Sequence, residues 1–268
     1  MRSIFAISLV TLKECLRDPA FVVIVIVFSG LMVIGGSMAL FALGRETEMV
    51  REMGLSSLML GGLVSVLLCG TSTVVEERRT RTALPTLAKP VSRRCLVIGK
   101  YYGIMMAVAL VLALLTIVLC AVLAAREGTE EIAGTGNGDA VGSPLLLEVG
   151  KAALLTYFEL ALLAALVVAL SLFLSRLVSV AICLGLFTLG HLTDEAIRQL
   201  GISAHGGPGK PFFEALPRLE YFRVATLVAE RQSAVTAAYI GWAAIYAICG
   251  AAIVLLISMA LFEKREIT

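Results

Sequence analysis

Charged side chains are scarce in this sequence. Asp, Glu, Lys and Arg make up 16% of the 268 residues, whereas hydrophobic residues make up 59%. A soluble domain of this length needs more polar side chains to cover its surface, so the composition argues against an ordinary soluble protein. The net charge is only +2. Because phosphate binding needs a concentrated basic face with groups that read or stack on bases, we expect no nucleic-acid partner.

Paired cysteines and enzyme motifs are also missing. The six cysteines are widely separated, without the CxxC or Cys/His spacing of metal sites, so neither a metal site nor a disulfide framework is expected. The pair Gly99-Lys100 is followed by Tyr101 and lacks the glycine spacing that holds phosphates. No hydrolase arrangement such as HExxH or Gly-x-Ser-x-Gly is present. We therefore expect that the chain is not an enzyme by itself and binds no cofactor.

Long apolar runs are what the sequence does contain. About 20 apolar residues cross about 30 Å of hydrocarbon. Six runs approach or exceed that length, and they predict an all-α polytopic membrane protein that forms a single transmembrane domain over residues 1–268. The predicted spans cover residues 21–43, 55–75, 101–125, 150–174, 177–191 and 235–262.

The first 18 residues have a different pattern. Apolar residues such as Ile4, Leu9, Leu12 and Cys15 share one arc of a helical wheel, and charged residues lie opposite. This predicts an amphipathic helix in the headgroup region that ends at Asp18-Pro19. A simple membrane anchor and a second docking surface for a cytoplasmic partner are both compatible with it.

One charged segment, residues 76–100, lies between two apolar runs and sets the orientation. It contains seven basic residues, and Lys and Arg remain on the cytoplasmic side in short loops. We therefore place this connector and both termini in the cytoplasm, and residues 44–54, 126–149 and 192–234 in outer loops. The predicted location is the cytoplasmic membrane, with lipid as a constant partner.

The connector also has a recognisable order of residues. It resembles the first cytoplasmic connector of ATP-binding-cassette type-2 permeases, where a pattern like EE(R/K)xxGT, then (K/R)P(V/L)SR, then GK recurs. Arg81 stands where a glycine is common, and Pro85 where a leucine is usual. The resemblance implies that a set of connector residues couples the chain to an ATPase subunit: Glu76, Glu77, Arg78, Arg79, Thr82, Lys89, Pro90, Ser92, Arg93, Gly99 and Lys100.

The same resemblance implies a function and partners. The chain would be the permease subunit of a prokaryotic inner-membrane ABC exporter that moves an unknown substrate. It would pair with a second permease copy or a similar permease, and with separate ATPase subunits that bind ATP and Mg²⁺. One alternative is a permease-like mechanotransmitter or membrane scaffold that acts on an extracytoplasmic partner without moving cargo. Another is a secondary transporter, which would depend on an ion gradient and on Glu159.

Two ionisable residues in apolar surroundings are the remaining candidates. Glu159 lies near the middle of the fourth predicted span, where a carboxylate is costly and points by default into the bundle. It is either part of a transport pathway or a hydrogen-bonded structural residue. His191 ends the fifth predicted span beside Asp194 and Glu195, which favours an interfacial helix end over a proton relay.

Overall fold

The computed structural model describes residues 2–38, 46–80, 93–132, 143–200 and 237–264, and the regular elements in these ranges are seven helices. In chain order they are α1 (Arg2–Arg17), α2 (Pro19–Met38), α3 (Glu46–Thr80), α5 (Arg93–Ile132), α6 (Ser143–Ser171), α7 (Arg176–Leu200) and α10 (Ala237–Lys264).

Five of these helices are long and apolar enough to cross a membrane. Their apolar parts are Pro19–Ser37, Met49–Thr73, Cys95–Ala125, Leu147–Ser171 and Ala238–Leu261, which agree with five of the six predicted spans. The remaining span, predicted at 177–191, falls in α7, whose apolar part Arg176–His191 is shorter than the other five. The chain is thus an all-helical, multi-pass membrane protein.

The boundary between the first two helices lies at Asp18, as predicted. The backbone nitrogen of Asp18 donates to the oxygen of Glu14 at 3.2 Å, which closes α1. The Oδ1 atom of Asp18 accepts a hydrogen bond from the nitrogen of Ala20 at 3.0 Å. Asp18 therefore caps α2, and Pro19 occupies the first helical position, where its missing N–H costs nothing.

Several helices extend further than the charge pattern predicts. α3 already begins at Glu46, within residues 44–54 that the pattern assigns to a loop. α5 continues to Ile132 and α6 begins at Ser143, so the expected loop 126–149 is helical at both ends. Part of the expected loop 192–234 belongs to α7, and residues 201–234 lie outside the described ranges. The expectation was wrong at these ends because charged residues end a membrane span without ending the helix, whose backbone hydrogen bonds continue into water.

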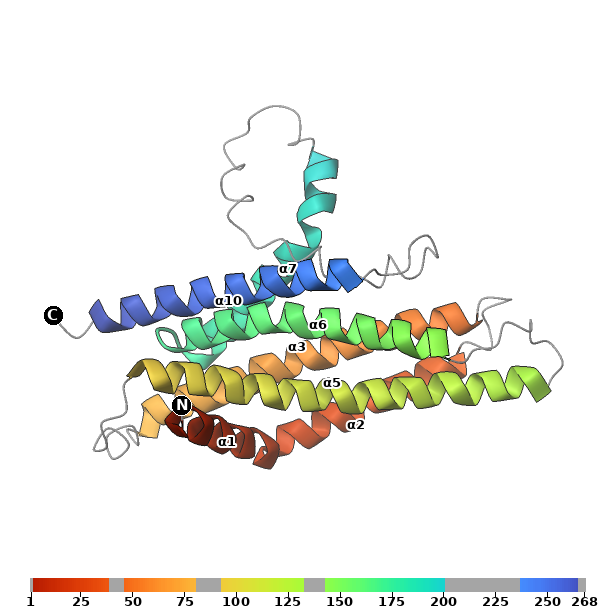
Figure 1. Cartoon of the computed structure of the whole chain (residues 1–268), viewed down its shortest axis with the longest axis horizontal. Coiled ribbons are helices and arrows are strands. Elements are labelled where there is room, and N and C mark those ends of the chain that lie inside the picture. The colour runs from red at the N-terminus through yellow and green to blue at the C-terminus, as the bar shows by residue number, and fades with distance from the viewer. Residues whose placement is uncertain (1, 39–45, 81–92, 133–142, 201–236, 265–268) are drawn as a thin grey trace.

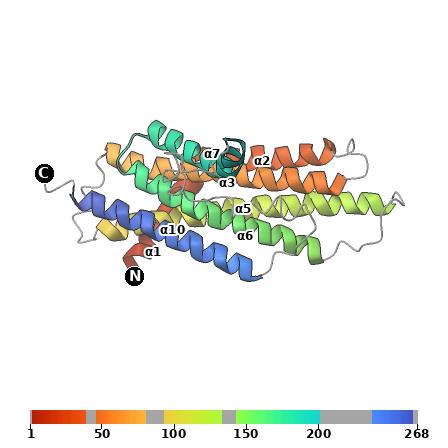
Figure 2. The same ribbon diagram turned by 90° about the horizontal axis from the view of Figure 1, so that it is seen from above.

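The core lies between α3, α5 and α6. Figure 2 shows α10 along α6 on one side of the bundle and α2 beside α3 on the other. Close packing in the centre depends on glycines of α3: a Cβ atom on Gly62 would lie 2.4 Å from Leu160 Cδ1, and one on Gly70 would lie 2.5 Å from Val167 Cγ1. These small residues therefore serve contacts within the chain.

One end of the bundle gathers the segments that we predict to be cytoplasmic. Figure 1 shows α1, the end of α3, the start of α5 and the end of α10 near the same end of the molecule. The turn between α6 and α7 lies at that end too, whereas α10 begins toward the other. The arrangement of the helices is thus compatible with termini on one side of a membrane.

Candidate functional site

The start of α5, which is also the end of the predicted connector, is the contact surface for α1. A Cβ atom on Gly99 would lie 2.8 Å from Ile7 Cγ2. At Gly103, one turn further along, a Cβ atom would lie 2.6 Å from Thr11 Cβ and 2.8 Å from the backbone oxygen of Ser8. Glycines four residues apart let two helices approach until their backbones nearly touch. α1 is therefore fitted directly onto the first turns of α5.

The surface of α1 is divided into three faces. Small and polar residues, Ser8, Thr11 and Cys15, are buried against the bundle. Apolar residues such as Phe5 remain exposed on a second face, and charged residues such as Lys13 are exposed on a third. A helix that contacts protein, lipid and water at the same time needs three such faces. The arrangement therefore supports the predicted interfacial position of α1. The predicted apolar arc thus splits, because Cys15 faces the protein.

Lys100 joins α5 to the last turns of α3. Its side chain is 7% exposed, and its Nζ atom donates a hydrogen bond to the backbone oxygen of Thr73 at 2.9 Å. An ammonium donor makes a stronger bond than a neutral donor. The two helices that enter and leave the connector are therefore held together where it begins and ends.

A pair of buried thiols joins α1 to α3. Cys15 and Cys69 are 1% and 5% exposed. The Cys15 thiol donates a hydrogen bond to the sulfur of Cys69, and this bond together with burial raises the pKa of Cys15. Cys15 therefore remains a neutral thiol near pH 7 and packs as a small apolar group.

The structure describes the position of only some of the other predicted coupling residues. Glu76, Glu77, Arg78 and Arg79 belong to the last turns of α3, and Arg93 opens α5, so these five lie on the two helices that flank the connector. Thr82, Lys89, Pro90 and Ser92 lie outside the described residues. Gly99 and Lys100 are the members of the set whose contacts are described, and both join helices.

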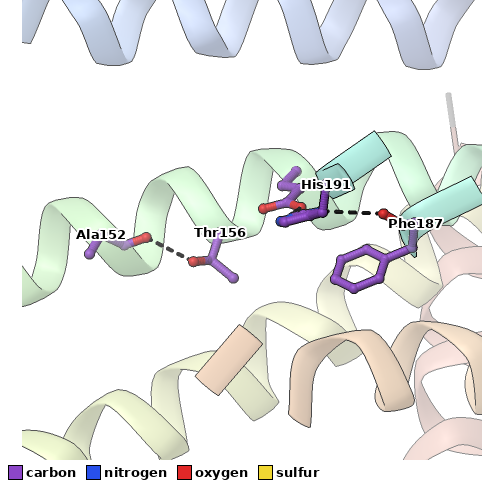
Figure 3. A network of polar contacts seen from close by, with 5 residues as sticks. Ala152, Thr156, Phe187 and His191 are labelled. Atoms are coloured by element: carbon purple, nitrogen blue, oxygen red, sulfur yellow. Dashed lines mark hydrogen bonds and ion pairs between the residues drawn. The ribbon is translucent and has the colours of Figure 1, made fainter. Parts of the chain in front are cut away.

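Glu159 lies inside the bundle on α6, as predicted for an acid in this position, and it meets His191 of α7. The Oε1 atom of Glu159 is 3.5 Å from Nε2 of His191, and the two side chains are 3% and 17% exposed. Figure 3 shows His191 with Phe187, whose backbone oxygen lies 3.3 Å from His191 Nδ1, and Thr156 on the neighbouring helix α6. The prediction that His191 is only an interfacial helix end missed this partner.

An ion pair joins α3 and α6 toward the end of the bundle that lies away from the connector. Arg51 Nη1 lies 3.8 Å from Glu148 Oε2, with side chains 10% and 40% exposed. Sequence reasoning places both residues in outer loops and does not pair them. Their contact follows from the helical continuation of α3 and α6 beyond the apolar runs.

The described residues contain no group of three or more His, Cys, Asp or Glu side chains arranged to hold a metal ion. No protein-family model matches the chain, and no curated protein matches it.

Proposed function

We propose that this chain is the membrane-spanning permease subunit of an ABC transporter of the type-2 exporter kind. Residues 76–100 would form the cytoplasmic connector against which a separate ATPase subunit docks. Nucleotide binding and hydrolysis would occur in that partner, and the permease would convert its closure into movement of α3 and α5. The cargo is not specified by this proposal.

The observation that carries the proposal is the junction of three helices around the connector. Lys100 holds α5 to α3, and Gly99 and Gly103 seat α1 on α5. A force applied to the connector therefore reaches three helices as one body, because packed helices move as rigid units. A charged loop that merely linked two spans would not need a buried ammonium group at its end.

The proposal includes six crossings, with α7 as the fifth. α7 has 25 residues, which corresponds to about 37 Å at 1.5 Å per residue. In this proposal the C-terminal half of α7, which Figure 1 shows directed away from the bundle, aligns with the other crossings in the membrane. With six crossings, both termini lie in the cytoplasm, on the side of the basic connector.

The test is to purify the chain together with a soluble ATPase encoded in an adjacent reading frame. We expect a stable complex, and we expect that reversing two connector charges, Glu76→Lys with Glu77→Lys, reduces bound ATPase at least about tenfold. The matched control is Glu52→Lys, an exposed acid nearer the other end of α3, which should leave the complex unchanged. Failure of the wild-type chain to bind any ATPase subunit would overturn the proposal.

Reconstituted vesicles then separate export from mechanical transmission. ATP-dependent uptake of cargo into inside-out vesicles supports the exporter. ATPase activity that an extracytoplasmic protein controls, without cargo movement, would instead establish the mechanotransmitter.

A further inference from the structure

The contact between Glu159 and His191 lies in the membrane-spanning part of the bundle. Glu159 is halfway along the apolar part of α6, Leu147–Ser171, and its neighbours Leu155, Leu160 and Leu163 are fully buried. The Oε1 atom of Glu159 has no hydrogen-bond partner at closer range among the described residues, and it lies 3.5 Å from His191 Nε2. A carboxylate in such surroundings is unfavourable unless a donor faces it.

The hydrogen bond on the other side of the imidazole ring determines which atom faces Glu159. The Nδ1 atom of His191 lies 3.3 Å from the backbone oxygen of Phe187. A carbonyl oxygen can only accept, so Nδ1 must carry a hydrogen for this contact to be a hydrogen bond. In a neutral ring Nε2 then has a lone pair and no hydrogen, and this atom lies 3.5 Å from Glu159 Oε1.

Two lone pairs cannot face each other favourably at this distance. One proton between the two atoms removes the conflict in either of two ways: a protonated Glu159 donates to Nε2, or a protonated His191 donates to the carboxylate. Both arrangements contain the same number of protons. The contact is thus favourable with one proton for the pair, whichever atom carries it.

We propose that Glu159 and His191 together form a binding site for a single proton, and that this proton holds α7 against α6. Binding joins one proton to a carboxylate and a neutral imidazole, and release returns it without breaking any other bond. After release, the anionic carboxylate of Glu159 faces the Nε2 lone pair of His191 in apolar surroundings. Separation of α7 from α6 then becomes energetically favourable.

The placement of α7 makes it the helix that can respond. α10 packs along α6 far more extensively than α7 does, and α7 makes its other main contact with α3. Figure 1 shows the C-terminal half of α7 directed away from the bundle. Separation from α6 would therefore disrupt little other packing.

Among the side chains that the structure describes, the other titratable groups on the helices around α6 do not take over this role. Away from the ends of the described helices these groups are thiols and phenols, which as classes ordinarily titrate well above pH 7: Cys69 on α3, Cys95, Tyr101, Tyr102 and Cys120 on α5, Tyr157 on α6 itself, Cys183 on α7, and Tyr239, Tyr246 and Cys249 on α10. The charged groups Arg51, Glu52, Glu148 and Lys151 lie toward one end of the bundle, and Lys100 and Arg176 lie near the other.

The first test measures the shared proton in the chain reconstituted in lipid nanodiscs, without any ATPase. The chain has two histidines, so ¹⁵N-histidine spectra can be assigned with His191→Gln. We expect the pH at which the His191 signal changes to shift by more than about one unit in Glu159→Gln and to stay constant in the exposed control Glu52→Gln. An unchanged His191 titration in Glu159→Gln would overturn the proposal.

The second test measures the packing of α7 through Cys183, which is 1% exposed. In a chain that keeps only this cysteine, His191→Leu leaves Glu159 without its partner, and we expect maleimide to label Cys183 at least about fivefold faster. The double variant Glu159→Leu with His191→Leu removes both polar groups and should restore slow labelling, since replacing both partners by apolar groups is nearly neutral. Equal labelling in the single and double variants would contradict the proposal. Neither test involves the ATPase partner, so both stand apart from the proposed function.

Discussion

Lys100 of α5 donates a hydrogen bond from its Nζ atom to the backbone oxygen of Thr73 of α3, over 2.9 Å and almost out of contact with solvent. Lys100 is the last residue of the predicted connector, and Thr73 lies just before its first residues. The bond therefore fixes the two helices on either side of the connector relative to each other. It gives a physical reason for a Gly-Lys pair at this place: the glycine admits α1, and the lysine reaches α3.

Replacing Lys100 should loosen the junction of α3 and α5. We expect Lys100→Met to lower the free energy of unfolding by about 1.5–3 kcal/mol, the range for hydrogen bonds to charged groups. Thermal unfolding in detergent measures the change. The matched control is Lys13→Met, at an exposed position of α1, which should change stability by less than about 0.5 kcal/mol. An equal loss in both variants would contradict the role assigned to Lys100.

A methyl group at Gly103 should displace α1. In Gly103→Ala the new Cβ would meet the backbone oxygen of Ser8 at 2.8 Å, and backbone cannot rotate aside. We expect a loss of about 1–3 kcal/mol in stability. Gly241→Ala on α10 is the control, because no atom lies within 4 Å of the place that its new methyl group would take, and alanine favours a helix. If Gly103→Ala is as stable as Gly241→Ala, α1 is not seated as described.

Cys15 should be protected from thiol reagents in the folded chain. Its pKa is raised by the hydrogen bond to Cys69 and by burial, so the reactive thiolate is depleted near neutral pH and becomes more abundant as the pH rises. We expect alkylation at pH 8 to be at least about tenfold slower than after denaturation. Mass spectrometry of the alkylated peptide gives the rate, and Gly103→Ala should increase it. Rapid labelling of Cys15 in the wild-type chain would show that α1 is not held against α3.

The ion pair between Arg51 and Glu148 should contribute little on its own. Glu148 is 40% exposed and the closest atoms are 3.8 Å apart, so we expect Glu148→Gln to cost less than about 1 kcal/mol. Reversing both charges, Arg51→Glu with Glu148→Arg, should recover part of the loss caused by Arg51→Glu alone. A double-mutant cycle with thermal unfolding measures this coupling, and a coupling of zero would show that the two charges do not interact.

The sequence was sufficient to predict the five helices that are long and apolar enough to cross a membrane, and the amphipathic α1 with its end at Asp18. These features depend on local patterns, namely the length of apolar runs and the chemistry of an Asp-Pro pair. The start of α3 at Glu46 was missed because charge marks the membrane surface and does not mark a helix end.

In the candidate sites, too, only features that depend on a local pattern could be predicted from the sequence. Glu159 stood out because a carboxylate in an apolar run is conspicuous in one segment. Its partner His191 belongs to another helix, and which side chains meet depends on the rotation and register of α7 on α6. The contact of α1 with Gly99 and Gly103 was hidden for that reason too, although glycines four residues apart at the start of a membrane helix are a signal for close helix packing.

The side of the membrane on which the connector lies tests the central claim most directly. In a chain whose only cysteine is introduced by Ser92→Cys, a membrane-impermeant maleimide should label inside-out vesicles and leave intact cells unlabelled. That result places the connector in the cytosol, where an ATPase can reach it. Labelling of Ser92→Cys in intact cells would place the connector outside and contradict the account.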